Sequence, residues 1–299
     1  MKRRDWSIGL YAPAGLVTDG GAIERAIARL EAQGHRVIVD ATCSARWQRF
    51  AGTDETRLAA VMRMANDPRI ELAMAVRGGY GWSRLLDALD FTALAETGKQ
   101  WLGHSDFTAF QLAALAKTGM VTYAGPMAAY DFGAVDPSAF TQDHCWELLA
   151  AGTMALDLAL DGPEIDAAGM LWGGNLALVA HLAGTRHFPR VDGGILFLED
   201  IGEAAYRVER MLYQLHFCGV LARQRAVLLG NFSSCEPGPN DNGYDLDAVI
   251  AHARRQFGVP IYTGLPFGHV RDKLTLPVGG QARLTVRDGR ARFIVSGAA

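Results

Sequence analysis

Long hydrophobic runs are missing from this sequence, and their absence argues against a membrane-spanning helix. No window of the 299 residues reaches the roughly twenty consecutive apolar residues that cross a bilayer. Basic residues at 2–4 precede an apolar stretch over 6–17, as in a signal peptide, but Gly9, Pro13 and Gly15 interrupt that stretch. We therefore interpret it as a first strand and loop, and we expect a cytoplasmic protein.

Cysteine is scarce and is not spaced for structural chemistry. The four cysteines form no C-x-x-C pair, which argues against a zinc ribbon and a disulfide framework and favours reduced thiols. The eight histidines show no H-E-x-x-H or other metal-ligand spacing. We therefore expect neither a metal nor another cofactor. The cysteines are Cys43, Cys145, Cys218 and Cys235.

An excess of positive charge is also absent. The formal net charge is -3, which offers no basic footprint for nucleic acid, so we expect no nucleic-acid partner. Because no apolar run is long enough to span a bilayer, we expect no membrane partner either. With 49% hydrophobic and 20% charged residues, the composition is that of a globular protein. The length suits two domains, each with its own hydrophobic core.

The first half alternates short apolar runs with amphipathic stretches, which predicts a parallel sheet covered by helices on both faces. In the helix predicted over 22–30 the apolar side chains share one face, and Gly34 follows its end. A second helix is predicted over 53–65, with Thr53 as its N-cap. The predicted strands are 7–11, 36–40, 71–76, 101–103 and 121–123.

A polar stretch over 152–168 interrupts this pattern, and we expect the crossing between two domains there. We predict an N-terminal α/β domain over 1–153 and a C-terminal mixed α/β domain over 154–299. Near the end of the chain, Asp288-Gly289 is a strong signal for a hairpin turn. The second half is predicted to contain helices 175–182, 204–217 and 246–256, and strands 194–198, 226–229, 260–262, 274–276, 282–286 and 291–295.

A serine lies where a nucleophile is expected. The predicted strand 101–103 leads to a helix predicted over 107–117, and Ser105 lies at the turn between them. There its hydroxyl projects beyond the sheet, and N–H groups of the next helix turn can stabilise an oxyanion. The position equally suits a simple helix cap, and Phe107 replaces the second glycine of the G-x-S-x-G motif. From the pattern alone, both interpretations stay open.

The loop Arg77-Gly78-Gly79-Tyr80-Gly81 is rich in glycine and follows a predicted strand. Three glycines in four positions let the backbone approach a ligand closely. The loop lacks the Lys-Ser/Thr ending of a phosphate-binding P-loop. A contribution of Gly79 to an oxyanion hole is therefore the more coherent functional interpretation.

Two further segments supply an acid and a base. The predicted strand 194–198 ends at Glu199-Asp200, with Glu203 shortly after, at a sheet edge of the kind where α/β proteins bind ligands. Asp200 and Glu203 also suit a solvated helix N-terminus. His269 lies in a loop after a late strand, where most histidines have no catalytic role. Together with the serine, these side chains supply a nucleophile, a base and an orienting acid.

Many segments along the chain match, in order, the motifs of a single family. They are FAGT at 50–53 with Arg57, RGGYG at 77–81 with Arg84-Leu85-Leu86, GHSDFT at 103–108, GPM at 125–127, LWGGNL at 171–176, LEDI at 198–201, RVERML at 207–212 and GLPFGH at 264–269. On these motifs the sequence resembles the LD-carboxypeptidases, the muramoyltetrapeptide carboxypeptidases of bacterial murein recycling.

The resemblance implies a catalytic site, a fold and an assembly. The family's serine, glutamate and histidine fall on Ser105, Glu199 and His269, the same positions that the residue patterns indicate. Backbone N–H groups of Gly79 and Asp106 are implied to form the oxyanion hole. The implied fold is α/β, with a flavodoxin-like or class I amidotransferase-like parallel-sheet domain carrying the serine and a smaller mixed α/β domain carrying the acid and the base. A homodimer is implied as well.

The implied activity is that of a serine carboxypeptidase that releases terminal D-alanine from murein tetrapeptides. The bond cut joins the L-centre of the third residue, diaminopimelate or lysine, to D-alanine. Arg77 and Arg84 are candidates for binding the free carboxylate. Two alternatives are a related self-immunity peptidase that cleaves peptide-nucleotide antibiotics and a non-catalytic peptide-binding protein. The match over 103–108 favours the recycling enzyme over the first, and the intact triad disfavours the second.

Overall fold

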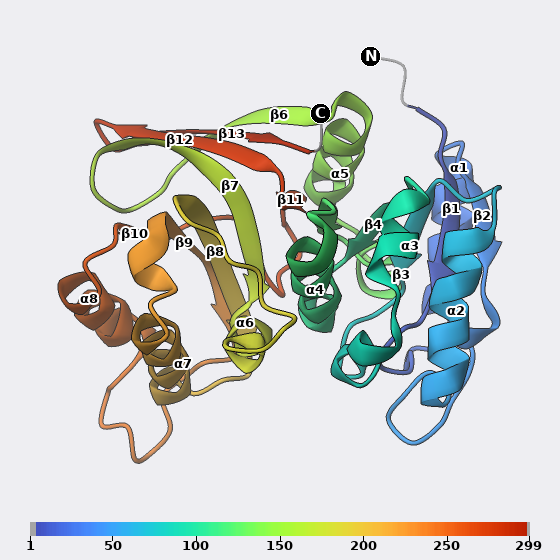
Figure 1. The fold of residues 1–299 in the computed structure, drawn as a ribbon, viewed down its shortest axis with the longest axis horizontal. Helices are drawn as coiled ribbons and strands as arrows, with labels where there is room; N and C mark the ends of the chain where they lie inside the picture. The colour runs from blue at the N-terminus through green and yellow to red at the C-terminus, as the bar shows by residue number, and fades with distance from the viewer. Residues whose placement is uncertain (1–3, 298–299) are drawn as a thin grey trace.

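The computed structural model describes residues 4–297 as two β-sheets with helices packed around them (Figure 1). Strand β1 (Ser7–Tyr11) contains part of the apolar stretch near the N-terminus and continues into a loop, as the sequence predicts. Lys2 and Arg3, from the basic start of that segment, lie outside the described residues. No helix within 4–297 is both long and apolar enough to cross a bilayer.

The first sheet has six strands and is parallel except at one edge. Across the sheet the order is β11 (Leu276–Val278), β5 (Thr122–Ala124), β4 (Gln100–Gly103), β3 (Leu72–Ala75), β1 and β2 (Arg36–Val39). Only β11 runs antiparallel to its neighbour. Every residue of β3 is buried, as in a strand covered on both faces. The strands predicted for the first half are therefore confirmed to within one residue.

Helices cover this sheet on both faces. Those of the first half are α1 (Ala22–Ala32), α2 (Asp54–Asn66), α3 (Phe91–Glu96), α4 (Thr108–Thr118), the π-helix η5 (Ala128–Phe132) and α5 (Ala139–Ala151). In Figure 1, α2, α3 and α4 lie together in front of the sheet, and α1 packs against η5. Thr53 caps α2 as predicted, because its hydroxyl accepts from the Thr56 N–H at 3.2 Å. Helices α3 and α5 were not predicted.

The second sheet has seven strands and is mixed. Its order is β10 (Ile261–Tyr262), β9 (Gln224–Ser233), β8 (Gly194–Ile201), β7 (Ile165–Asn175), β12 (Gln281–Arg287), β13 (Arg290–Ser296) and β6 (Thr153–Leu158). Strands β7 to β10 are parallel, and β12, β13 and β6 add an antiparallel part. Asp288 and Gly289 have positive φ values of 49° and 71° in the predicted hairpin turn. The helices beside this sheet are α6 (Leu176–Leu182), α7 (Ala205–Phe217) and α8 (Leu246–Gln256).

The stretch 152–168, where the sequence suggests a polar crossing between domains, contains β6 and the start of β7. The two acids on its strands are exposed and pair across strands: Asp157 contacts Arg292 at 2.9 Å, and Asp166 contacts Arg283 at 2.9 Å. Because of these charged residues, the sequence pattern indicates a polar linker and not strands with alternating buried and exposed residues. The domain limit after residue 153 stays a prediction.

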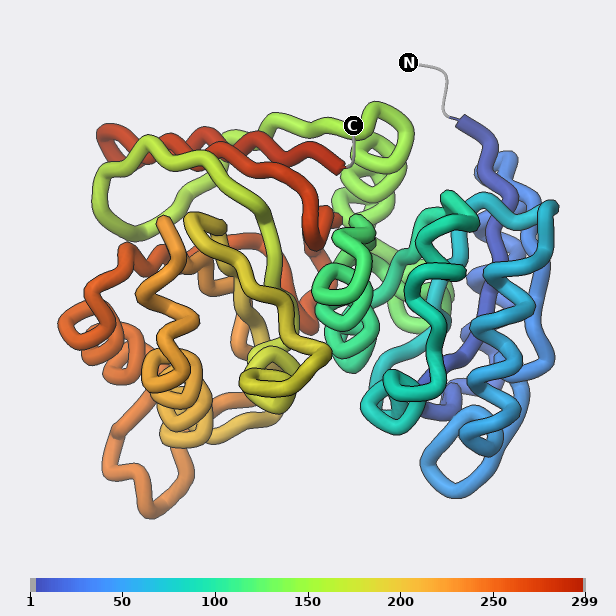
Figure 2. Tube along the Cα trace, in the orientation of Figure 1, coloured from blue at the N-terminus to red at the C-terminus, as the bar shows by residue number. Residues whose placement is uncertain are grey.

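The end of the chain connects the two sheets. Strand β11 belongs to the C-terminal half yet completes the first sheet beside β5. Figure 2 shows the red end of the described chain returning to the green helix α5, where the Gly297 N–H donates to the Gly152 carbonyl at 2.8 Å. The two sheets are therefore joined by backbone hydrogen bonds as well as by the chain itself.

Candidate active site

Ser105 lies at a sharp turn between β4 and α4, as the sequence predicts. Its φ is +64°, a left-handed conformation that is uncommon outside glycine and is found at strained functional turns. The 3-10 turn η4 (Ser105–Phe107) then leads into α4. Gly103 permits this turn, because a Cβ atom there would lie 2.4 Å from the Phe107 ring. The turn directs the serine hydroxyl beyond the end of the strand, as nucleophile turns do.

His269 lies on the loop after β10 and is held against β9. The Asn231 N–H donates to the Phe267 carbonyl at 2.7 Å. Gly230 permits this approach, because a Cβ atom there would lie 2.3 Å from the same carbonyl oxygen. The loop brings His269 Nε2 to 3.0 Å from Ser105 Oγ.

Glu199 lies on β8, which is longer than the predicted strand 194–198. The register between β8 and β9 shifts beside it, as in the bulges that redirect side chains near active sites. The Glu199 side chain is fully buried, and its Oε2 lies 2.7 Å from His269 Nδ1. Burial alone would raise the pKa of Glu199, but His104 and His269 outweigh that effect and lower it to about 2. The group facing the imidazole is therefore an ionised carboxylate.

Asp200 is not the solvated helix-end acid that the sequence allows, because it is buried beside Glu199. It does serve a helix end, since it accepts from the Ala177 N–H at the start of α6 at 2.9 Å. It also accepts from Asn175 Nδ2 at 2.9 Å, and the same amide lies 3.2 Å from Glu199 Oε1. Burial raises the pKa of Asp200 to about 6. Glu203 stays partly exposed.

A cavity of about 650 Å³ opens over these groups, and Ser105, His269 and Gly79 line it. Gly79 has a φ of +99°, which favours glycine. The Asp106 side chain points into the same glycine-rich loop and accepts from the Trp82 N–H at 3.0 Å. Burial raises the pKa of this carboxyl to about 6. The structure thus brings both predicted oxyanion-hole residues close to Ser105, while their role stays a prediction.

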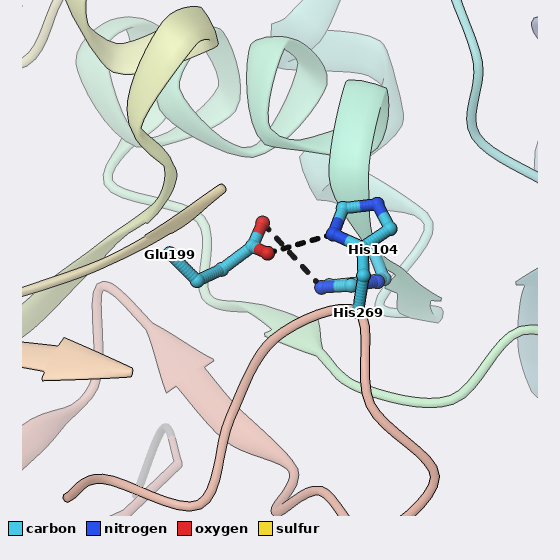
Figure 3. A group of neighbouring side chains, drawn as sticks. All are labelled: His104, Glu199 and His269. Carbon is cyan, nitrogen blue, oxygen red and sulfur yellow. Dashed lines mark hydrogen bonds and ion pairs between the residues drawn. The ribbon is translucent and has the colours of Figure 1, made fainter. Parts of the chain in front are cut away.

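Two side chains beside Glu199 were not singled out from the sequence: His104 and Asn175. His104 is buried, and its Nε2 lies 3.5 Å from Glu199 Oε1, with its ring 4.5 Å from the His269 ring (Figure 3). Burial lowers the pKa of His104, although Glu199 opposes the effect. Only its place next to Ser105 could have indicated a role.

Three of these side chains could hold a metal ion. Ligand atoms of His104, Glu199 and His269 lie within 4.8 Å of one another. Rules based on ligand spacing miss this group, because its members come from three separate segments.

Comparisons with known proteins point to one family. Models of the LD-carboxypeptidase N-terminal domain and of the LD-carboxypeptidase C-terminal domain match residues 8–125 and 168–284. The chain belongs to the LD-carboxypeptidase family. It is therefore an enzyme of the carboxypeptidase class, and its parallel and mixed sheets confirm the predicted α/β fold.

Several relatives of this chain match it over nearly its whole length. A murein tetrapeptide carboxypeptidase of Pseudomonas aeruginosa is 32% identical over 295 residues, which span 94% of this chain and 93% of the relative. A crystal structure of muramoyltetrapeptide carboxypeptidase from Oxalobacter formigenes is 44% identical, with a TM-score of 0.92 over 97% of this chain and 98% of that one. A microcin C7 self-immunity protein is 21% identical, with a TM-score of 0.89 over 100% and 97%, and shares the fold.

Proposed function

We propose that this member of the LD-carboxypeptidase family is a serine peptidase that removes the terminal D-alanine from murein tetrapeptides. The observation that carries the proposal is the series Ser105, His269 and Glu199, of which Ser105 and His269 line the cavity and Glu199 is buried behind them. Ser105 Oγ lies 3.0 Å from His269 Nε2, and His269 Nδ1 lies 2.7 Å from Glu199 Oε2. These distances support the roles of nucleophile, base and orienting acid for the three residues.

In the proposed first step, His269 Nε2 takes the proton of Ser105 as the serine oxygen attacks the carbonyl carbon before D-alanine. His269 then gives that proton to the departing amine of D-alanine, which leaves an ester on Ser105. Water, activated by the same imidazole, hydrolyses the ester and releases the tripeptide. Glu199 holds the His269 tautomer and stabilises the imidazolium that forms in each step.

The proposed oxyanion hole consists of the N–H groups of Gly79 and Asp106. Asp106 follows Ser105 directly, at the start of η4. The glycine-rich loop lies beside the nucleophile, since a Cβ atom on Gly78 would lie 3.1 Å from Ser105 Oγ. The hydrogen bond from Trp82 to the Asp106 carboxylate ties this loop to the serine turn. These contacts support a rigid pair of donors, as oxyanion stabilisation requires.

Arg77 is the better candidate for binding the free carboxylate of the substrate. It lines the cavity, and its guanidinium lies 5.6 Å from the Tyr130 ring. Arg84 lies outside the cavity lining and pairs with Asp54 at 2.7 Å. The free carboxylate of the substrate belongs to the residue directly after the scissile bond, so a cation that lines the cavity can reach it. The guanidinium of Arg77 suits this role because it can form two parallel hydrogen bonds to a carboxylate.

The substrate class rests on the relatives. The Pseudomonas aeruginosa protein bears the name murein tetrapeptide carboxypeptidase, and the Oxalobacter formigenes structure that of a muramoyltetrapeptide carboxypeptidase. We extend that substrate to this chain and propose that it acts in the cytoplasm on peptides from murein turnover.

Fluorophosphonate labelling tests whether the serine is activated. We expect an adduct that peptide mass mapping assigns to Ser105, because such probes react with a serine beside a general base. Ser105→Ala should not be labelled, and His269→Ala should be labelled far more slowly. A folded wild-type protein that takes no label would favour a non-catalytic peptide-binding protein.

A muropeptide mixture tests the substrate. Mass spectrometry after incubation with the wild-type protein should show tetrapeptides losing a single alanine. Tetrapeptides that stay intact beside a well-labelled Ser105 would contradict the proposed substrate while leaving the serine chemistry in place.

A further inference from the structure

His104 carries a buried nitrogen that the proposed mechanism does not use. The residue is 2% exposed, and its Nε2 makes no hydrogen bond to any of the described residues. That atom nevertheless faces Glu199 Oε1 at 3.5 Å, slightly beyond a normal hydrogen bond. A buried polar atom without a hydrogen bond is uncommon and calls for an explanation.

We propose that His104, Glu199 and His269 form a binding site for a borderline divalent cation such as Zn²⁺, and that an ion bound there inhibits the enzyme. Figure 3 shows both imidazole rings directed at the one carboxylate. Their ligand atoms lie within 4.8 Å of one another. Small side-chain shifts would therefore bring each ligand atom to the 2.0–2.2 Å from a shared ion that zinc prefers. Two imidazoles and one carboxylate form a known zinc ligand set, which leaves the fourth position for water.

The surroundings of the three ligands suit an ion. Asn175 Nδ2 donates to Glu199 Oε1 at 3.2 Å and to Asp200 Oδ1 at 2.9 Å. This amide orients the Glu199 carboxylate, as hydrogen-bond partners of metal ligands commonly do. The Phe267 ring meets the His104 ring edge to face at 5.2 Å and restrains it. His104 and His269 also line the active-site cavity, which gives an ion a path to the site.

A bound ion and the base function of His269 exclude each other. In the proposed triad, Nδ1 of this ring carries the proton and Nε2 accepts the proton of Ser105. An ion at Nδ1 needs the lone pair of that nitrogen, so the ring proton moves from Nδ1 to Nε2. The Nε2–H then faces Ser105 Oγ, 3.0 Å away, and cannot accept a proton. Inhibition follows from this shift of tautomer, with no proton gained or lost.

The ligand set also predicts which ions bind. Imidazole nitrogen favours zinc and its neighbours in the transition series, whereas magnesium and calcium prefer sites built of oxygen. Zinc is therefore expected to bind and to inhibit, and magnesium to do neither.

Equilibrium dialysis of Ser105→Ala protein against Zn²⁺ tests the site without relying on catalysis. We expect one tightly bound zinc per chain and at least tenfold weaker binding once His104→Phe is added. The matched control is His187→Phe, because His187 also contacts a carboxylate, Asp87 at 2.7 Å, at a distance from the triad. Equal zinc binding with and without His104→Phe would overturn the site.

Cobalt spectra provide a second measurement in case His104→Phe does not fold. Co²⁺ added to the Ser105→Ala protein should give the intense visible bands of a four- or five-coordinate ion with nitrogen ligands. Weak bands typical of a hydrated octahedral ion would overturn the site without any change to His104.

The inhibitory part of the inference rests on the proposed function and is tested by D-alanine release. Saturating Zn²⁺ should lower the rate at least tenfold, EDTA should restore it, and Mg²⁺ should have no effect. EDTA alone should leave the rate unchanged. Zinc that binds in dialysis without slowing the enzyme, or activity that EDTA abolishes and zinc restores, would overturn the inhibition. Absence of peptidase activity would contradict the proposed function and leave the dialysis result to decide on the site.

Discussion

Three buried carboxyl groups near Ser105 differ in pKa because their partners differ. The pKa of Glu199 is lowered to about 2 by two histidines that outweigh its burial. Burial raises the pKa of Asp106 and of Asp200 to about 6, since their partners are mainly backbone N–H groups and an amide. Only Glu199 combines a secure negative charge with contact to His269, and this supports its proposed role as the orienting acid.

The substitution Glu199→Gln tests that role. It keeps the size of the side chain and removes the charge that holds the His269 tautomer, so we expect kcat to fall by roughly 10² to 10⁴. Steady-state kinetics check this, with circular dichroism to confirm folding. Glu203→Gln is the matched control and should stay within about tenfold of wild type, because its partner is the exposed Arg207, 3.6 Å away. Near-normal kcat in folded Glu199→Gln would remove Glu199 from the triad.

Asp200→Asn should destabilise the fold in a pH-dependent way. The folded pKa of about 6 lies above the ordinary 3.8, so this carboxyl stabilises the fold fully at low pH, and that stabilisation is lost as the pH rises through 6. Asparagine does not titrate. The variant should therefore melt below wild type at pH 4.5, and the gap in unfolding free energy should shrink by roughly 2 kcal/mol by pH 7.5. A gap that widens over this range in thermal melts would refute the assignment.

Sequence patterns indicated some residues of the site and missed others for physical reasons. Ser105 could be found because a strand and a helix leave a turn between them. Selecting Glu199 from the neighbouring acids needed the resemblance, since the strand-end acids Glu199 and Asp200 looked alike. His104 and Asn175 were missed because their contacts with Glu199 join residues far apart in the chain.

At the scale of elements, hydrophobic pattern decided what could be predicted. The parallel strands of the first sheet are short apolar runs, and all except the edge strand β2 are largely buried, so their limits were predicted to within a residue. Strand β6 alternates buried Met154 and Leu156 with exposed residues, but its acid and the Gly162-Pro163 turn after it resemble a linker. The edge position of β11 could not be predicted, because strand pairing between distant segments leaves no local pattern.

The glycine-rich loop gives a prediction at this scale. Gly79→Ala places a side chain at a φ of +99°, which costs roughly 1–3 kcal/mol or rotates the adjoining peptide. If its N–H serves the oxyanion hole, kcat should fall roughly 10- to 10³-fold with little change in KM.

The control for this prediction is Gly98→Ala, at a φ of +64° with no neighbouring atom within 4 Å of the added Cβ. It also places a Cβ atom at a positive φ, away from the cavity, and should keep wild-type kcat. Equal activity of the two folded variants would count against Gly79 as a donor.

At the scale of the whole molecule, the site depends on how the two sheets are held together. Ser105 follows a strand of the first sheet, whereas Glu199 lies on the second sheet and His269 on a loop beside it. Strand β11 joins the first sheet from the C-terminal half, so the serine and its base are held in register by backbone pairing. Substitutions that weaken the pairing of β11 with β5 should lower the rate of catalysis before they destabilise either sheet.

The predicted homodimer is a property of the whole molecule that rests on the resemblance. Light scattering coupled to size-exclusion chromatography should give twice the chain mass at micromolar concentration. A mass equal to one chain across the working range would contradict the prediction and leave the triad unaffected, since Ser105, Glu199 and His269 all come from a single chain.

The most direct test of the central claim is the release of alanine from two synthetic murein tetrapeptides that differ only in the configuration of the last residue. We expect the wild-type protein to convert the peptide ending in D-alanine into tripeptide and D-alanine in equal amounts and to leave the peptide ending in L-alanine largely intact. Folded Ser105→Ala should lose activity by roughly 10³ or more. Release of D-alanine by that variant at the wild-type rate, or no release by the wild-type protein, would contradict the account.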